Sequence, residues 1–563
     1  MWRGRLVSCY FKLILENKQS NQGVTMSSLD GFRDLDFMEQ IVLLGDVQAK
    51  ADGAAIAELR ELFVTPVGDR AVDTMLRKVL RELLLRHPKE LVGGLNAESL
   101  ELARFCVVLS GEARLAEAMA PLMELVRAWR EDREALHDCL IALGRIGDHA
   151  AVPVFRENLV HEDDFIACAC VSNLGIFGDQ ICQPRLEAMI NANEAPERSG
   201  ECLATTWVAV EALLALDSDN ALAYLASKIH HANPTARRLI QQGLVHKGDR
   251  AVPFLTDLLG RTEDTDEKIL LANALGYIGY RAVANDLIDA LESGRLGTAN
   301  ERFAGYEALG RIPGMKSIVF LQGALWRETD PLVLLAIVKG LDGLSVDAVA
   351  QGVAKDIEAR LAETSEAVRP VLRAVATSGA GTLFAALACL PGCGPLVLEM
   401  AALDADALTR EALAQSLSAR GMGREAEALR LSGATDEGSW HRKRMLAVDD
   451  SEAMRSFYAQ FGSFAGYDVQ TAENGRVALD MVESGDEFDL VVVDMNMPVM
   501  DGIELATKLR AMPELAALPI LMATTESSKS QARIARNAGV NTFVVKPFTH
   551  DQLREKIVNL VGN

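Results

Sequence analysis

The chain carries two different patterns of hydrophobic and polar residues. From about residue 50 to residue 430, apolar residues, mostly Ala and Leu, recur every three or four positions, which predicts a long series of amphipathic helices. Beyond that point short continuous apolar runs alternate with helical stretches, which predicts strands buried on both faces between helices. We therefore expect a multidomain chain, all-α at first and α/β at the end.

The helical part contains an internal repeat with a period of 31 to 38 residues. One phrase recurs where one helical pattern ends and the next begins: "ALGRIGDHAAVPVF", "NLGIFGDQICQPRL", "GLVHKGDRAVPFL", "ALGYIGYRAVANDL" and "ALGRIPGMKSIVFL". Spacings of 31, 70 and 31 residues separate Gly147, Gly178, Gly248 and Gly279, so a unit without this glycine, at 212–226, fills the middle interval. Helix pairs that cannot bury their apolar faces alone stack into a superhelical solenoid.

Each phrase predicts the same local structure. We expect Ala-Leu-Gly to end one helix, because glycine adopts the left-handed backbone that closes a helix. The following Gly-Asp supplies a turn and an N-cap, and Pro suits the first turn of the next helix. The phrases then have a folding role, and any function lies on the surface of the array.

The phrases resemble HEAT and HEAT-like repeats of the phycobilisome-lyase type, over roughly residues 100 to 430. The resemblance implies a scaffold that binds another protein. It leaves open a bilin-lyase-like or other enzymatic solenoid with the α/β domain at the end of the chain as its control module. The nine His are dispersed, and the cysteine pairs Cys168/Cys170 and Cys389/Cys393 lack zinc-site spacing, so we expect these thiols to be buried and reduced.

The last part of the chain predicts a parallel sheet covered by helices. After a polar linker at 431–443, strands are expected at 444–450, 467–472, 489–495, 519–524 and 542–547. Helices are expected to begin near Glu452, Gly475, Gly502, Ser527 and Thr549. The domain spans 444–563, and the solenoid spans 51–430.

Polar side chains gather where these strands end, at Asp449, Asp450, Asp494, Thr524 and Lys546. The carboxyl ends of parallel strands meet at one edge of a sheet, where reactive groups collect. Three carboxylates brought together repel one another and need a divalent cation, and a set of oxygen ligands suits Mg²⁺. With Mg²⁺ and the Lys546 ammonium beside it, Asp494 becomes a nucleophile for phosphoryl transfer.

The motifs "VDD", "DMNMPVMDG", "LMATTE" and "VVKPF" resemble the receiver domain of two-component response regulators, particularly the single-domain chemotaxis regulators. The resemblance implies a flavodoxin-like sheet of order 2-1-3-4-5 with Asp494 as phosphoacceptor. It implies that Mg²⁺ is held by Asp449, Asp450, Asp494 and the backbone carbonyl of Asn496. Thr524 and Lys546 would contact the phosphoryl group.

The same resemblance assigns roles around these residues. Phe543 takes the position of the switch aromatic, acting with Thr524. Asn496 and Glu526 match the polar pair of receivers that lose phosphate quickly, which predicts a short-lived acyl phosphate. The Lys546-Pro547 bond matches a cis position. Two departures are Thr525, where a small residue is usual, and Phe in place of Tyr at position 543.

Charge and composition narrow the partners. The formal charge is -22, and the last 122 residues hold 13 basic and 17 acidic side chains, so most of this charge lies before them. Direct DNA binding is disfavoured, because phosphate contacts need clustered Lys and Arg. The expected partners are a histidine kinase or phosphotransfer protein and an unknown protein bound by the solenoid. The receiver would catalyse only its own phosphorylation and dephosphorylation.

The N-terminal segment differs from the array that follows it. Residues 1–50 are set apart from the array. We expect this segment to be partly disordered or to include a mis-assigned start, with Met26 opening the natural chain. Lys12 interrupts the early apolar run, so a signal peptide is disfavoured. No apolar run reaches the roughly 20 residues of a membrane span, and the protein is expected to be cytoplasmic.

Overall fold

The computed structural model describes residues 29, 31–51, 53–194, 202–432, 443–524, 529–546, 548 and 550–561. The chain forms two compact units, one ending at Asn173 and one beginning at Leu174. The proposed start at Met26 and most of the linker at 431–443 lie outside the described residues. Among the described residues, no helix combines the length and the apolar composition needed to cross a membrane.

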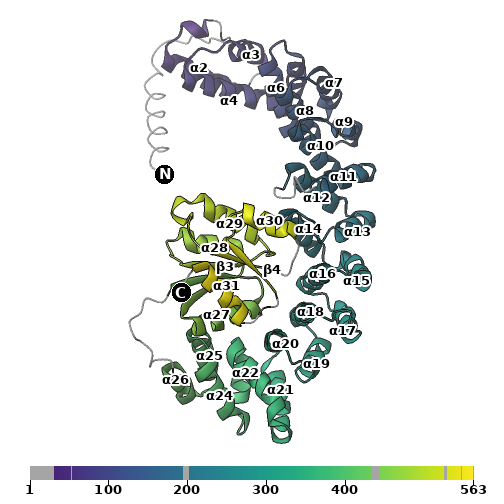
Figure 1. The fold of residues 1–563 in the computed structure, drawn as a ribbon. Coiled ribbons are helices and arrows are strands. Elements are labelled where there is room, and N and C mark those ends of the chain that lie inside the picture. The colour runs from purple at the N-terminus through teal and green to yellow at the C-terminus, as the bar shows by residue number, and fades with distance from the viewer. Residues whose placement is uncertain are drawn as a thin grey trace. The chain divides into compact units, whose positions relative to one another are not determined.

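The first unit is built of helices throughout its described part (Figure 1). Helix α2 lies within residues 1–50, the segment set apart from the array. Its capping box is formed by Asp36 and Glu39, an N-terminal signal the sequence reading did not use. The helices are α2 (Phe37–Lys50), α3 (Ile56–Val64), α4 (Arg70–Arg86), α5 (Pro88–Gly93), α6 (Leu100–Glu112), α7 (Met119–Ala128), α8 (Arg133–Ile146), α9 (Val152–Asn158) and α10 (Asp164–Ile176), the last reaching into the second unit.

The second unit continues the helices in two layers. From α12 to α24 each even-numbered helix contacts the next even-numbered one, and α13, α15, α17 and α19 contact one another in the same way. This pattern is that of stacked helix pairs. The helices are α11 (Gln183–Ala192), α12 (Ala204–Leu216), α13 (Asp219–Ser227), α14 (Pro234–Lys247), α15 (Val252–Arg261), α16 (Thr265–Ile278), α17 (Val283–Glu292), α18 (Ala299–Arg311), α19 (Met315–Ala324), α20 (Pro331–Leu344), α21 (Asp347–Glu363), α22 (Ser365–Ser378), α23 (Gly381–Ala388), α24 (Cys393–Asp404), α25 (Ala407–Ala419) and α26 (Gly423–Leu431).

The turn predicted inside the repeat is confirmed. Gly147 and Gly279 close α8 and α16 in the left-handed conformation, with φ of 81° and 67°. The unit that lacks this glycine uses Asp217, at φ 48°, in the same place after α12. Proline occupies the first turn of the following helix in α9, α11 and α15, as its fixed φ favours.

The role predicted for the Ala-Leu-Gly glycine is wrong. Gly276 lies inside α16, and a Cβ built on it would meet the Cα of Ala308 in α18 at 2.7 Å. Gly175 stands in the same relation to Ala212, at 2.8 Å, and Gly310 to Gly340, at 2.5 Å. These glycines let successive helices of one layer approach closely. The turn with positive φ comes three residues after Gly175 and Gly276, at Gly178 and Gly279.

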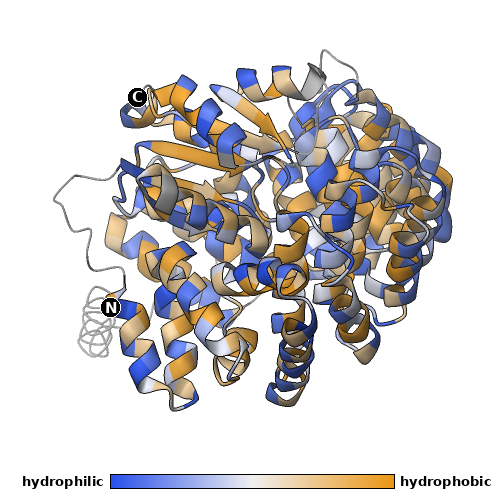
Figure 2. Cartoon of the chain, turned by 60° about the horizontal axis from the view of Figure 1, so that its bottom comes forward, coloured by the Kyte–Doolittle hydropathy of each residue, from blue (hydrophilic) through white to orange (hydrophobic). Residues whose placement is uncertain are grey.

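The end of the chain forms the predicted parallel sheet, in the order β2-β1-β3-β4-β5. The strands are β1 (Lys443–Val448), β2 (Tyr467–Ala472), β3 (Leu490–Asp494), β4 (Ile520–Thr524) and β5 (Thr542–Val545). Helices α27 (Glu452–Ala465), α28 (Gly475–Glu483), α29 (Gly502–Ala511), α30 (Lys529–Asn537) and α31 (His550–Val561) alternate with them. Apolar clusters lie on both faces of the sheet, whose strands are largely hydrophobic (Figure 2).

The cysteines mostly follow expectation. Cys170 and Cys393 are buried, and Cys168 is partly buried. Burial raises the pKa of the Cys170 thiol to about 12. Cys389, however, is exposed, so the prediction for it is wrong. Its position at the end of α23 places it beyond the apolar face of that helix.

Candidate functional site

The carboxyl ends of β1 and β3 bring the predicted site residues together. Lys546, just after β5, donates from Nζ to Asp449 Oδ2 at 2.7 Å and to Asp494 Oδ1 at 2.6 Å. Asp449 is fully buried, and Asp494 is 6% exposed. One ammonium therefore bridges two buried carboxylates at the edge of the sheet.

The loop after β3 is shaped around Asp494. The backbone N–H of Asn496 donates to Asp494 Oδ2 at 2.8 Å. Asp501 caps α29 by accepting from the N–H of Glu504, at 2.8 Å. A Cβ on Gly502 would lie 2.2 Å from the carbonyl oxygen of Asp494, so only glycine fits at the start of α29. In the same loop Val499 has φ 66°, a strained conformation for a β-branched residue.

Burial and mutual repulsion dominate the electrostatics of the site. Burial raises the pKa of Asp494 to about 7, with Lys546 opposing and Asp449 and Asp450 adding to the rise. Burial raises the pKa of Asp449 as well. For Lys546 burial acts downward, but the two carboxylates outweigh it and leave its pKa well above the ordinary value. Negative charge at this site is under-compensated, which favours binding of a cation.

The carboxylates fit Mg²⁺ in chemistry but are not yet convergent. Asp449, Asp450 and Asp494 offer oxygen ligands only, the set that Mg²⁺ prefers. Among the described residues, their oxygens do not form a group within 4.8 Å of one another. Asp450 Oδ2 instead accepts a hydrogen bond from the Tyr277 hydroxyl of α16, at 2.7 Å.

Other side chains of the helical array also reach the site. Arg237 of α14, 1% exposed, donates from a terminal guanidinium nitrogen to Asn496 Oδ1 at 3.0 Å. Asn300 of α18 donates to the backbone carbonyl of Lys546. A cavity of about 70 Å³ lies between α14, α16, α18, α20 and the ends of the strands, lined by Asp449, Asp450, Asp494, Asn496 and Lys546 on the sheet side. The array therefore forms one wall of the site.

The same face of the array holds the rest of this domain. Arg238 of α14 pairs with Glu504 at 3.0 Å, and Lys339 of α20 pairs with Glu452 at 2.6 Å. Gln460 of α27 donates to the carbonyl of Thr377 in α22 at 2.8 Å. The even-numbered helices supply all of these contacts, and they lie in succession beside the sheet (Figure 1).

The remaining predicted residues are placed in part. Thr524 ends β4, is 2% exposed, and its hydroxyl contacts the Met495 sulfur at 3.8 Å. Phe543 in β5 is partly buried against an apolar cluster of the sheet. Glu526, Thr525 and Pro547 lie outside the described residues.

Sequence reasoning missed Tyr277, Arg237 and Asn300, because they lie 173, 259 and 246 residues from the groups they contact. One signal existed for Tyr277. It fills the repeat position between Ala-Leu-Gly and Ile-Gly that holds Arg in "ALGRIG" and "ALGRIP". This position lies at the end of an even-numbered helix and holds different polar residues in different units, which indicates a surface suited to contacts.

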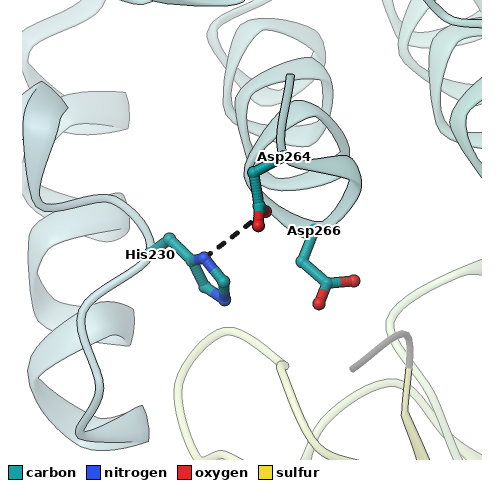
Figure 3. A group of neighbouring side chains, drawn as sticks. All are labelled: His230, Asp264 and Asp266. Atoms are coloured by element: carbon teal, nitrogen blue, oxygen red, sulfur yellow. Dashed lines mark ion pairs between the residues drawn. The ribbon is translucent and has the colours of Figure 1, made fainter. Parts of the chain in front are cut away.

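A second group of potential cation ligands was also missed. His230, Asp264 and Asp266 place ligand atoms within 4.8 Å of one another, and His230 Nδ1 lies 3.6 Å from Asp264 Oδ1 (Figure 3). Asp264 also caps α16, accepting from the N–H of Glu267 at 2.8 Å. Helix capping and one ion pair account for His230 and Asp264 in this group.

Comparison with known proteins identifies the domain. The response regulator receiver domain family matches residues 445–558. A chemotaxis protein CheY homolog of Campylobacter jejuni is 39% identical over 120 residues, which cover 21% of this chain and 92% of that protein. Chemotaxis protein CheY-3 of Vibrio cholerae is 44% identical over 115 residues, covering 20% of this chain and 88% of that protein. The solved structure of CheY4 of Vibrio cholerae shares 36% identity, covers 21% of this chain and 98% of that chain, and gives a TM-score of 0.20. Through this domain, the chain belongs to the response regulator receiver family of two-component signalling.

Proposed function

We propose that the chain is a response regulator whose receiver, at 444–563, accepts a phosphoryl group on Asp494 and controls a HEAT-like array at 51–430 that binds another protein. The phosphoryl donor is a histidine kinase or a phosphotransfer protein. The single observation that carries the link between the two parts is the contact of Tyr277 with Asp450 inside the site.

The geometry supports transfer to Asp494. A carboxylate oxygen of Asp494 forms the new O–P bond while the P–N bond to the donor histidine breaks, and the imidazole keeps the electron pair and takes up a proton. Lys546, 2.6 Å from Asp494, faces the charge on the phosphoryl oxygens. Mg²⁺ held by Asp449, Asp450 and Asp494 would neutralise the same charge when bound. Asn496 keeps the carboxylate in place through its N–H.

Phosphorylation changes the surroundings of the array contacts. A phosphoryl group adds nearly two negative charges and new acceptor oxygens beside Asn496 and Asp450, which Arg237 and Tyr277 contact. Because these two side chains already contact the residues around Asp494, the added charge shifts the balance between docked and released arrangements of the receiver. Release of the receiver exposes the array surface beneath it, and docking covers that surface.

The lyase-like alternative has less support. Such chemistry on a thiol needs an accessible thiolate. Cys106 and Cys170 are buried, and the exposed Cys389 donates its S–H to the carbonyl oxygen of Ala385 at 3.2 Å. Burial raises the pKa of Cys106 to about 11 and that of Cys170 to about 12. The phosphorylation-controlled scaffold therefore remains the function we propose.

The assignment of Asp494 has a direct test. The full chain is incubated with Mg²⁺ and acetyl phosphate, and the acid-stable, base-labile acyl phosphate is measured on wild type and on Asp494→Asn. Wild type is expected to be modified and Asp494→Asn unmodified, since the nucleophile is gone. Asp468→Asn, an exposed carboxylate on β2, serves as the control and should behave as wild type. Modification of Asp494→Asn at the wild-type level would refute the assignment.

A further inference from the structure

Tyr277 is held firmly where it meets the receiver. Its hydroxyl donates to Asp450 Oδ2 at 2.7 Å. The Arg311 guanidinium lies over its ring, 4.3 Å from the centroid, and Arg311 is paired in turn with Glu307 at 3.4 Å. Arg311 occupies in α18 the repeat position that Tyr277 occupies in α16. Two successive units thus build a support for one hydroxyl group.

This hydroxyl acts on the carboxylate that the cation site still needs. Asp449 and Asp494 are already joined through Lys546, whereas Asp450 is held by Tyr277. Among the described residues, the three carboxylates do not converge within 4.8 Å. Because a hydrogen bond to a charged group is stronger than one between neutral groups, turning Asp450 toward a cation requires that this bond be weakened or broken.

We propose that Tyr277 is a positioning residue that holds Asp450 in an arrangement with low affinity for Mg²⁺, so that cation binding and docking of the receiver on the array oppose each other. The inference rests on the proposed function, which assigns Asp449, Asp450 and Asp494 to the cation. Coupling between two binding events is reciprocal, so Mg²⁺ must loosen the contact at α16 as much as that contact weakens Mg²⁺ binding.

The opposite role for Tyr277 is also defined. A side chain that hydrogen-bonds to a metal ligand can instead raise metal affinity, when it holds that carboxylate in the position that binds the metal. In that case the oxygens of Asp449, Asp450 and Asp494 would already converge, and they do not. The two roles predict opposite effects of removing the hydroxyl group.

The test is a calorimetric titration of the full chain with MgCl₂, without phosphodonor. Tyr277→Phe is expected to bind Mg²⁺ about ten-fold more tightly than wild type, the effect of losing one hydrogen bond to a charged group. Tyr280→Phe, on an exposed side chain three residues further, is the matched control and should leave the affinity unchanged. Equal or weaker binding by Tyr277→Phe overturns the inference.

Failure of the underlying assignment gives a different result. Asp449→Asn is expected to abolish the binding, and binding that survives it would overturn the cation site itself rather than the role of Tyr277. Hydrogen exchange supplies a second readout. Mg²⁺ should speed exchange in the last turn of α16 in wild type, and in Tyr277→Phe that turn should exchange fast from the start. Exchange that does not respond to Mg²⁺ in wild type overturns the coupling.

Discussion

At the scale of single residues, Asp494 is a group whose ionisation is opposed by its surroundings. Its carboxylate is buried with two other carboxylates nearby, and Lys546 compensates them only in part. Burial raises its pKa from 3.8 to about 7, so the folded chain keeps a proton that the unfolded chain releases between those values. The stability that this proton represents is present below about pH 4 and is lost as the pH rises through 7.

Asp494→Asn should remove this dependence. Thermal unfolding is measured at pH 5 and pH 8 in a Mg²⁺-free buffer with chelator. The free energy of unfolding of wild type should be lower at pH 8 than at pH 5, by on the order of 1 kcal/mol or more, and the variant should lack this difference. The control Asp468→Asn should follow wild type. An equal loss of stability in wild type and Asp494→Asn would contradict the raised pKa.

At the scale of elements, the array depends on close approach of its even-numbered helices, called the inner helices because they supply the contacts with the receiver. Gly276, Gly175 and Gly310 lie within helices where a helix-forming residue would be better in isolation. In the stack each faces the backbone of the next inner helix, and a methyl group would collide with it. The repeat thus gives up helix propensity to bring its layers together.

Gly276→Ala and Gly352→Ala separate these effects. Gly352 lies in α21 with nothing within 4 Å of a built Cβ, so its replacement should stabilise the chain by roughly 0.5–1 kcal/mol. Gly276→Ala should destabilise by about 1–3 kcal/mol, because the new Cβ meets Ala308. Thermal unfolding of both variants beside wild type measures the two effects. A stabilised Gly276→Ala would mean that α16 and α18 are not closely packed.

At the scale of the whole molecule, the receiver is docked on the array by its reactive end. Asp494 is 6% exposed, and α14, α16, α18 and α20 line the cavity in front of it. Under the proposed function, a phosphodonor would reach the Asp494 carboxylate more easily when this contact opens. Since Arg238 is among the charged groups that hold the receiver, the ease of opening is under the control of a few side chains.

Arg238→Glu should open the contact. It replaces a cation paired with Glu504 and near Asp501 by a like charge, so repulsion takes the place of attraction. Modification of Asp494 by acetyl phosphate should then be severalfold faster in a time course. Arg250→Glu, which disturbs a similar pair with Asp219 inside the array, should keep the wild-type rate. Equal rates for both variants would show that docking does not limit access.

Much of this organisation could be predicted from local sequence. The five strands and the gathering of Asp449, Asp494 and Lys546 follow from apolar runs that lead into polar residues, because parallel strands end at one edge. The order of the strands came from the resemblance to receiver domains. The turns after α8 and α16 follow from Gly147 and Gly279 in the left-handed conformation. The sequence order does not disclose packing partners, so the Ala-Leu-Gly glycine was assigned to the wrong task.

By itself the sequence determined the receiver domain, its candidate nucleophile and the helical repeat, because each depends on residues close in the chain or on the topology of a parallel sheet. Only the tertiary structure decided which side chains of the array contact the receiver. Tyr277 and Arg237 meet Asp450 and Asn496 across 173 and 259 residues. Such a contact depends on how many helix pairs stack between the two segments, and no local pattern of residues specifies that number.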